Sequence, residues 1–149
     1  LSIVLFADIQ KQIIMNVPAP FRMIVTRRIF NKIAERIAQK NNYLALVSGD
    51  SLGQVASQTL ENMTVIANAS DMLKFSPLIG MNKKDILDIA NKIGTFDISS
   101  RPYEDCCSLF IAKHPATRSK LGEVLKYEEL IDRSIIDNVE VNLSAFSCK

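Results

Sequence analysis

Two adjacent cysteines, Cys106 and Cys107, carry the most reactive side chains in this sequence of 149 residues. They end the polar run "YEDCC", in a stretch without helical or strand periodicity. A loop thiol with a positive neighbour can act as a nucleophile or carry sulfur, whereas a buried cysteine is commonly a packing residue. Both interpretations stay open for the pair, while we expect Cys148, near the end of the sequence, to be inert.

Other common catalytic and metal-binding patterns are missing from the sequence. It has one histidine, His114, and three cysteines without a C-x-x-C pair, so we expect no metal site. It also lacks the G-x-S-x-G and Walker lysine motifs, and triad hydrolysis therefore has no support. The odd number of cysteines argues against a disulfide framework and favours a reducing cytoplasm.

Arg27 is the cation whose position most clearly requires a partner. Helical spacing predicts a long helix from Phe21 to Asn41, and Arg27 lies at the edge of its apolar stripe, whereas Arg28 points away from it. An arginine that faces a sheet needs an anion. That anion is either a carboxylate of the same domain or a ligand phosphate, and the sequence leaves both open.

The stretch "SGDSLG", residues 48–53, places two glycines between a predicted strand and a predicted helix. Such a junction points backbone N–H groups outward at a helix start, which suits a phosphate or a nucleotide. Gly49 either makes a tight turn or lets a ligand approach the backbone. Gln58, slightly further on, can donate to and accept from a base or phosphate, although glutamine is also common near helix starts.

The elements that would position these residues alternate between strand and helix. We expect buried strands at Ser2–Phe6 and Tyr43–Ser48 and a short strand or extended segment at residues 63–70. Helices are expected at residues 8–16, 21–41, from about 53, 82–94 and 121–136. The buried stripe of the long helix is expected to contain Phe30, Ile33, Ala34, Ile37 and Ala38. This order predicts an α/β fold with a parallel sheet covered on both faces, and ligands at the carboxyl ends of its strands.

Composition and charge set limits on the class of protein. A hydrophobic content of 48% in 149 residues fits one domain with a real core, and no run is long enough to span a bilayer. Residues 1–43 hold seven Lys or Arg against two acidic residues, although the whole chain has a net charge of only +2. This basic half can face nucleic-acid phosphates, or it can be a solvated helix face.

Three blocks together resemble one known family. They are "SGDSLGQVASQTLENM", "SPLIGMNKKDILDIANKIGTFDIS" and "RPYEDCCSLFIAKHP". The sequence is similar to the tRNA 4-thiouridine sulfurtransferases that also serve thiamine biosynthesis, over nearly the whole chain. The resemblance implies a doubly wound α/β domain of the adenine-nucleotide alpha-hydrolase-like, or PP-loop, type that activates a tRNA uridine with ATP.

One motif of that family is not in this sequence. The PP-loop itself, a Ser-Gly-Gly-x-Asp-Ser turn after the first strand, is not among residues 1–149. The family pattern places it before Leu1, together with the first strand and the tRNA-binding THUMP region. Residues 1–149 are therefore expected to be one partial PP-loop domain, which would be inactive alone.

The resemblance also implies roles for particular residues. Arg27, Gly49 and Gln58 match ATP contacts of the family, and the sulfur-carrying cysteine falls at Cys106 or Cys107. ATP with Mg²⁺, a tRNA, and a cysteine desulfurase as sulfur donor are the implied cofactors and partners, in the cytoplasm, with a homodimer as one allowed state. The rival hypothesis is a non-catalytic module that binds a nucleotide or tRNA.

Overall fold

The computed structural model describes residues 1–102, 110, 112–139 and 141–143. Cys106, Cys107 and Cys148 lie outside these residues. The described helices are α1 (Ala7–Asn16), α2 (Arg22–Lys40), α3 (Leu60–Ala67), α4 (Lys83–Lys92), α5 (Phe96–Ser99), α6 (Leu121–Glu128) and α7 (Arg133–Asp137), with 3-10 turns η1 (Ala19–Phe21) and η2 (Ala56–Gln58). The described strands are β1 (Ser2–Val4), β2 (Ala45–Val47), β3 (Leu73–Phe75) and β4 (Val141–Leu143).

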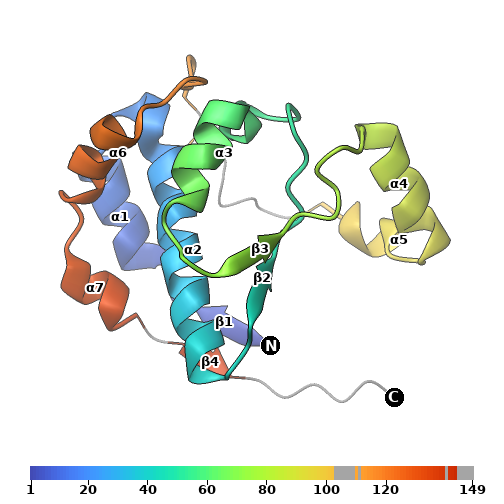
Figure 1. The fold of residues 1–149 in the computed structure, drawn as a ribbon, viewed down its shortest axis with the longest axis horizontal. Coiled ribbons are helices and arrows are strands. Elements are labelled where there is room, and N and C mark those ends of the chain that lie inside the picture. The colour runs from blue at the N-terminus through green and yellow to red at the C-terminus, as the bar shows by residue number, and fades with distance from the viewer. Residues whose placement is uncertain (103–109, 111, 140, 144–149) are drawn as a thin grey trace.

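Helix α2 runs through the centre of the molecule, and the other elements pack around it (Figure 1). Helices α1, α6 and α7 lie on one side, α3 and the β2–β3 pair lie on the other, and α4 and α5 project beyond the strands. Because α2 has neighbours on several sides, its apolar side chains form the centre of the core. Its fully buried members are Ile24, Val25 and Ile29, which are at most 1% exposed.

The strands form two small sheets in the described part of the chain. β2 pairs with β3 in parallel, while β1 pairs with β4 in the antiparallel sense. The α/β class and a parallel strand pair are thus confirmed, and the doubly wound arrangement stays a prediction. The two predicted strands are not buried on both faces, because Ile3 is 46% and Val47 72% exposed. No second layer of described residues covers these side chains.

Residues 53–70 differ from the predicted helix and strand. Gly53 lies in a turn with a φ of +76°, and α3 begins only after Thr59, whose side chain accepts a hydrogen bond from the Asn62 N–H. The β-branched run in "MTVIANAS" is helical, because Val65 and Ile66 become buried when α3 packs on α2. Tertiary packing here outweighs the strand preference of these residues. Strand β3 was not predicted at all.

Two of the expected helices have different outcomes. Helix α4 falls within the expected range 82–94: Asn82 caps it in a reciprocal capping box with Asp85, and Gly94 after its end has a φ of +73°. The expected single helix over 121–136 is instead split into α6 and α7. The break is stabilised by Asp132, whose side chain accepts from the Ser134 N–H and caps the second helix.

The predictions for the surface of α2 are partly wrong. Phe30 is 42% exposed and packs its ring against Phe6 at 4.8 Å instead of entering the core. Arg28, predicted to point away, is 2% exposed and donates to the Glu128 carboxylate and the Val65 carbonyl. The pattern of one helix could not show this, because Glu128 lies 100 residues further along the chain.

The proposed basic face of α2 is largely used inside the fold. Lys32 pairs with the same Glu128 carboxylate as Arg28, and Arg36 donates to the carbonyls of Ile136, Asp137 and Val139. Burial opposes ionisation of Glu128, but hydrogen bonds from Arg28 and Lys32 outweigh it and lower its pKa below the ordinary value. These cations therefore hold α6 and α7 against α2.

Candidate functional site

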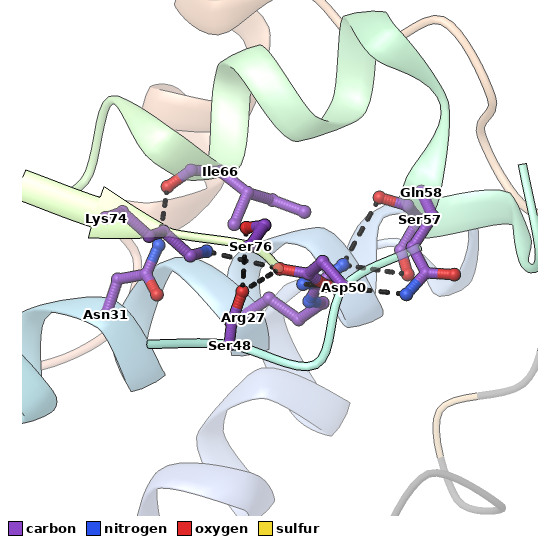
Figure 2. A network of polar contacts seen from close by, with 9 residues as sticks. All are labelled: Arg27, Asn31, Ser48, Asp50, Ser57, Gln58, Ile66, Lys74 and Ser76. Carbon is purple, nitrogen blue, oxygen red and sulfur yellow. Dashed lines mark hydrogen bonds and ion pairs between the residues drawn. The ribbon is translucent and has the colours of Figure 1, made fainter. Parts of the chain in front are cut away.

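The candidate site lies where β2 and β3 end. Ser48 follows β2 and Ser76 follows β3, and their hydroxyls lie 3.1 Å apart. The Ser48 N–H also donates to the Phe75 carbonyl at 2.9 Å, which extends the parallel ladder by one bond. The "SGDS" turn thus leaves the sheet at its carboxyl edge, as predicted, and Figure 2 shows the polar side chains that gather there.

Asp50 is the centre of this cluster. It is 5% exposed and accepts from Ser48 Oγ at 2.8 Å and from Gln58 Nε2 at 3.4 Å. Its carboxylate also forms ion pairs with Arg27 and, at 3.3 Å, with Lys74 Nζ (Figure 2). Burial opposes ionisation of Asp50, but these hydrogen bonds and the two cations outweigh it and lower its pKa to about 2.

Arg27 reaches the turn from the second turn of α2. Its guanidinium pairs with Asp50 and donates to the carbonyl and hydroxyl of Ser57 at 3.4 and 3.3 Å. The in-domain carboxylate that the sequence left open as a partner is therefore present. With 19% of its side chain exposed, Arg27 still reaches the surface. Since Lys74 adds a second cation, positive charge exceeds negative charge by one around Asp50.

Gln58 and Gly49 occupy neighbouring positions in this cluster. Gln58 uses its Nε2 for Asp50, but its Oε1 is buried and has no partner within the part of the chain that the structure describes. Gly49 is exposed between Ser48 and Asp50, and a Cβ built on it would meet nothing within 4 Å. The space around Gly49 is open to a ligand, whereas Gly53 is the glycine that the turn itself requires.

A cavity of about 380 Å³ opens beside these groups. Its polar wall contains Arg27, Asp50, Lys74 and Ser76, and its apolar wall includes Leu52, Leu60, Met63 and Ile79. An apolar cavity with a few convergent polar groups is typical of a small-molecule site. Of the three residues predicted to contact a nucleotide, Arg27 lines this cavity. Gln58 contacts the cavity only through Asp50, and Gly49 precedes Asp50 in the chain. The predicted cysteines lie outside the described residues.

Comparison with known proteins decides the family. The model of the thiamine biosynthesis protein (ThiI) family matches residues 1–132. This chain belongs to the ThiI family. It is 53% identical over 141 residues to the "Probable tRNA sulfurtransferase" of Caldanaerobacter subterraneus subsp. tengcongensis, covering 94% of this chain and 37% of that relative. It is 48% identical over 130 residues to the "Probable tRNA sulfurtransferase" of Halothermothrix orenii, covering 87% of this chain and 33% of that relative.

A solved structure resembles the fold closely. The crystal structure of a 4-thiouridine synthetase–RNA complex with bound ATP matches with a TM-score of 0.85 and 35% identity, covering 95% of this chain and 38% of that one. The chain thus spans roughly two fifths or less of the length of these ThiI-family relatives. The activity of the complete protein is therefore a proposal.

Asp50 and Lys74 are site residues that the sequence reasoning missed. Asp50 stands two residues after the predicted strand Tyr43–Ser48, and its position could have marked it as the carboxylate partner of Arg27. Lys74 had no such signal, because the strand that carries it was not predicted. Both residues line the same cavity as Arg27.

The described residues do not fit a Mg²⁺ site. Mg²⁺ prefers carboxylate and water oxygens, but the Asp50 carboxylate already faces two cations and two hydrogen-bond donors. In the described ranges no group of three or more His, Cys, Asp or Glu side chains could hold a metal ion.

No helix in the described ranges is long and apolar enough to cross a membrane.

Proposed function

We propose that this chain belongs to an enzyme that uses ATP to transfer sulfur to a tRNA uridine, forming 4-thiouridine, and that also supplies sulfur for the thiazole of thiamine. The observation that carries the proposal is the Arg27–Asp50–Gln58 cluster at the strand ends. It occurs in a chain whose fold matches a 4-thiouridine synthetase–RNA complex with bound ATP. Family membership supports the sulfur transfer, and the cluster supports binding of a phosphate or a nucleotide.

The chemistry has two parts. ATP adenylates the carbonyl oxygen of the uridine and releases pyrophosphate, which turns a poor leaving group into AMP. The outer sulfur of a cysteine persulfide then attacks the activated carbon and displaces AMP. A second thiol breaks the remaining S–S bond, so that the products are 4-thiouridine and a disulfide. The protein contributes mainly by holding the reactants together and by stabilising phosphate charge.

The described residues suit the first part. Arg27 and Lys74 provide two cations against one carboxylate, so a phosphate entering the cavity meets net positive charge. The buried Oε1 of Gln58 has no partner among the described residues, and it would accept a hydrogen bond from a nucleotide N–H group if the amide turned toward the ligand. The open space at Gly49 lets the ligand approach the backbone. We assign Arg27, Gly49 and Gln58 to ATP binding.

The second part is assigned to Cys106 or Cys107, which receives sulfur from a cysteine desulfurase in the cytoplasm. In this proposal the PP-loop and the THUMP region belong to other parts of the complete protein, which can act as a homodimer. The single partial PP-loop domain of residues 1–149 then supplies the second half of the ATP site.

Serine substitutions in the complete protein test this function. We expect Cys106→Ser or Cys107→Ser to abolish 4-thiouridine formation while ATP affinity stays near the wild-type value, and Cys148→Ser to be silent. Mass spectrometry of digested tRNA from cells that carry each variant measures the product. Full thiolation in both strains would remove the catalytic role of the pair. ATP and tRNA binding without any thiolation by the wild-type protein would favour the non-catalytic module.

A further inference from the structure

A short segment, residues 112–120, carries exposed positive charge that the fold does not use. Its sequence "AKHPATRSK" contains Lys113, Arg118 and Lys120 and no acidic residue. All three cations are exposed. This contrasts with α2, where Arg28, Lys32 and Arg36 are engaged with other parts of the chain. We call residues 112–120 the basic segment.

The backbone of the basic segment is fixed to the start of α3. Asn62, which is 0% exposed, donates to the Ala116 carbonyl at 2.8 Å and accepts from the Ser119 N–H at 3.1 Å. The Thr59 hydroxyl donates to the Thr117 carbonyl at 2.7 Å. A buried asparagine with both amide groups satisfied holds its partners in one geometry.

A further bond fixes the basic segment to η1, the 3-10 turn directly before α2. The Ala116 N–H donates to the Pro20 carbonyl at 3.1 Å. Ser119 is 6% exposed, whereas its neighbours Arg118 and Lys120 are exposed. Backbone and small side chains thus face the protein, and the cations face outward. Figure 1 shows this part of the chain as the orange loop that projects past α3 and α6.

The cations of the basic segment are available for a partner. Arg118 approaches Glu61 at 3.7 Å, but the two side chains are 87% and 51% exposed, so the pair contributes little to stability. Within the described ranges, no carboxylate pairs with Lys113 or Lys120. Arg118 and Lys120 flank the anchored Ser119, and Lys113 precedes the anchored Ala116 by three residues. An external anion can therefore meet these cations with little further ordering of the backbone at residues 116–120.

The location of the basic segment points to RNA rather than to a lipid surface. Two residues hold the segment: Thr59, which directly follows Gln58 of the candidate site, and Asn62, one helical turn later. A uridine that reacts at that site brings its own phosphates close to the same residues. The basic segment also has no large apolar side chain that could insert into a membrane.

We infer that Lys113, Arg118 and Lys120 form a phosphate-binding surface that docks the tRNA backbone beside the ATP site. This inference rests on the proposed function and names the surface that presents the tRNA to it. Contacts of this kind position the nucleic acid without reading its sequence.

Two triple variants of the complete protein, as its gene encodes it, test the inference. Lys113→Gln/Arg118→Gln/Lys120→Gln removes the cations of the basic segment. Lys11→Gln/Lys40→Gln/Arg133→Gln removes three exposed cations of α1, α2 and α7 and changes the net charge equally. Binding of an unmodified tRNA transcript is measured by fluorescence anisotropy from about 50 to about 200 mM KCl.

We expect the basic-segment variant to bind tRNA about tenfold more weakly near physiological salt, and the slope of log K against log salt to fall by about 2. The control variant should keep the wild-type slope. Equal slopes and affinities for the two variants would overturn the inference.

ATP titrations distinguish this failure from a failure of the proposed function. We expect both variants to keep the wild-type affinity for ATP. If the wild-type protein binds neither ATP nor tRNA, the proposed function is wrong and the inference falls with it. If it binds both and the basic-segment variant keeps its tRNA affinity, only the surface is wrongly assigned. Loss of ATP affinity together with tRNA affinity would mean that the variant distorts the site, and would also overturn the inference.

Discussion

Arg27 and Arg28 are neighbours in the sequence with different surroundings. Arg27 is partly exposed and joins the Asp50 cluster at a cavity edge, whereas Arg28 is buried against Glu128. Consecutive helical residues point about 100° apart, which is enough to separate a candidate ligand contact from a core contact. A shift of one position along the helix therefore decides whether an arginine lies at the cavity or in the core.

Replacing Arg27 should weaken ATP binding. We expect Arg27→Ala in the complete protein to lose about 1.5–3 kcal/mol of ATP binding free energy, the usual value of a charge-assisted hydrogen bond. Calorimetric titration measures it, with Arg133→Ala as the control because Arg133 is an exposed arginine of α7. Arg28→Ala is unsuitable as a control, since it disturbs the core. Equal ATP affinities for the two variants would show that the wrong arginine was chosen.

Asp50 should make the stability of the protein depend on pH in acid. Its pKa is about 2 in the fold against an ordinary 3.8, so its contribution is complete above about pH 4 and is lost as the pH falls through 2. The shift corresponds to about 2 kcal/mol of unfolding free energy. Asp50→Asn should remove that part of the acid dependence, as measured by calorimetry of the complete protein between pH 5 and about 2. A variant that loses stability in acid as steeply as the wild type would contradict this role.

At the scale of elements, α2 is held to α6 by a buried ion cluster. Arg28 and Glu128 are 2% and 8% exposed, and Lys32 approaches the same carboxylate from the surface. The Arg28 side chain also reaches Val65 of α3, so one residue connects three helices. The basic residues that suggested a nucleic-acid face instead join elements to one another.

Replacing Arg28 alone should lower the unfolding free energy more than replacing Arg28 and Glu128 together. We expect Arg28→Met to lower the unfolding free energy by about 3–5 kcal/mol, because it leaves Glu128 buried with one partner fewer. The double variant Arg28→Met/Glu128→Leu should recover much of that loss, since no buried charge is left without its partner. Calorimetry of the two variants gives the comparison. A double variant less stable than Arg28→Met would show that the cluster is a net source of stability.

At the scale of the whole molecule, one face of the β2–β3 pair is apolar and uncovered by described residues. Val47, Leu73 and Phe75 share this face by their parallel register and are 72%, 61% and 53% exposed. Contiguous apolar patches on a folded protein commonly mark an interface. Since the chain spans 37% of its relative from Caldanaerobacter, we expect another part of the complete protein to cover this face.

Charged substitutions on that face test its burial. We expect Val47→Lys and Leu73→Lys each to lower the unfolding free energy of the complete protein by about 1–3 kcal/mol, because a charge would be buried there. Met15→Lys is the control, since Met15 of α1 is 82% exposed and lies on another element. Thermal unfolding of the three variants is measured side by side. If the strand variants melt together with the control, the face is open to solvent in the complete protein.

The sequence alone determined the features that depend on neighbouring residues. The cap at Asn82, the glycine end at Gly94, the long helix that carries Arg27, and the polar turn after Val47 all follow from local patterns. Only the tertiary structure showed that Asp50 links Arg27 to Gln58 and Lys74, that Arg28 is buried against Glu128, and that Val65 and Ile66 lie in a helix. The physical reason is that burial and ion pairing join residues up to 100 positions apart, and no local spacing records which distant side chains will meet.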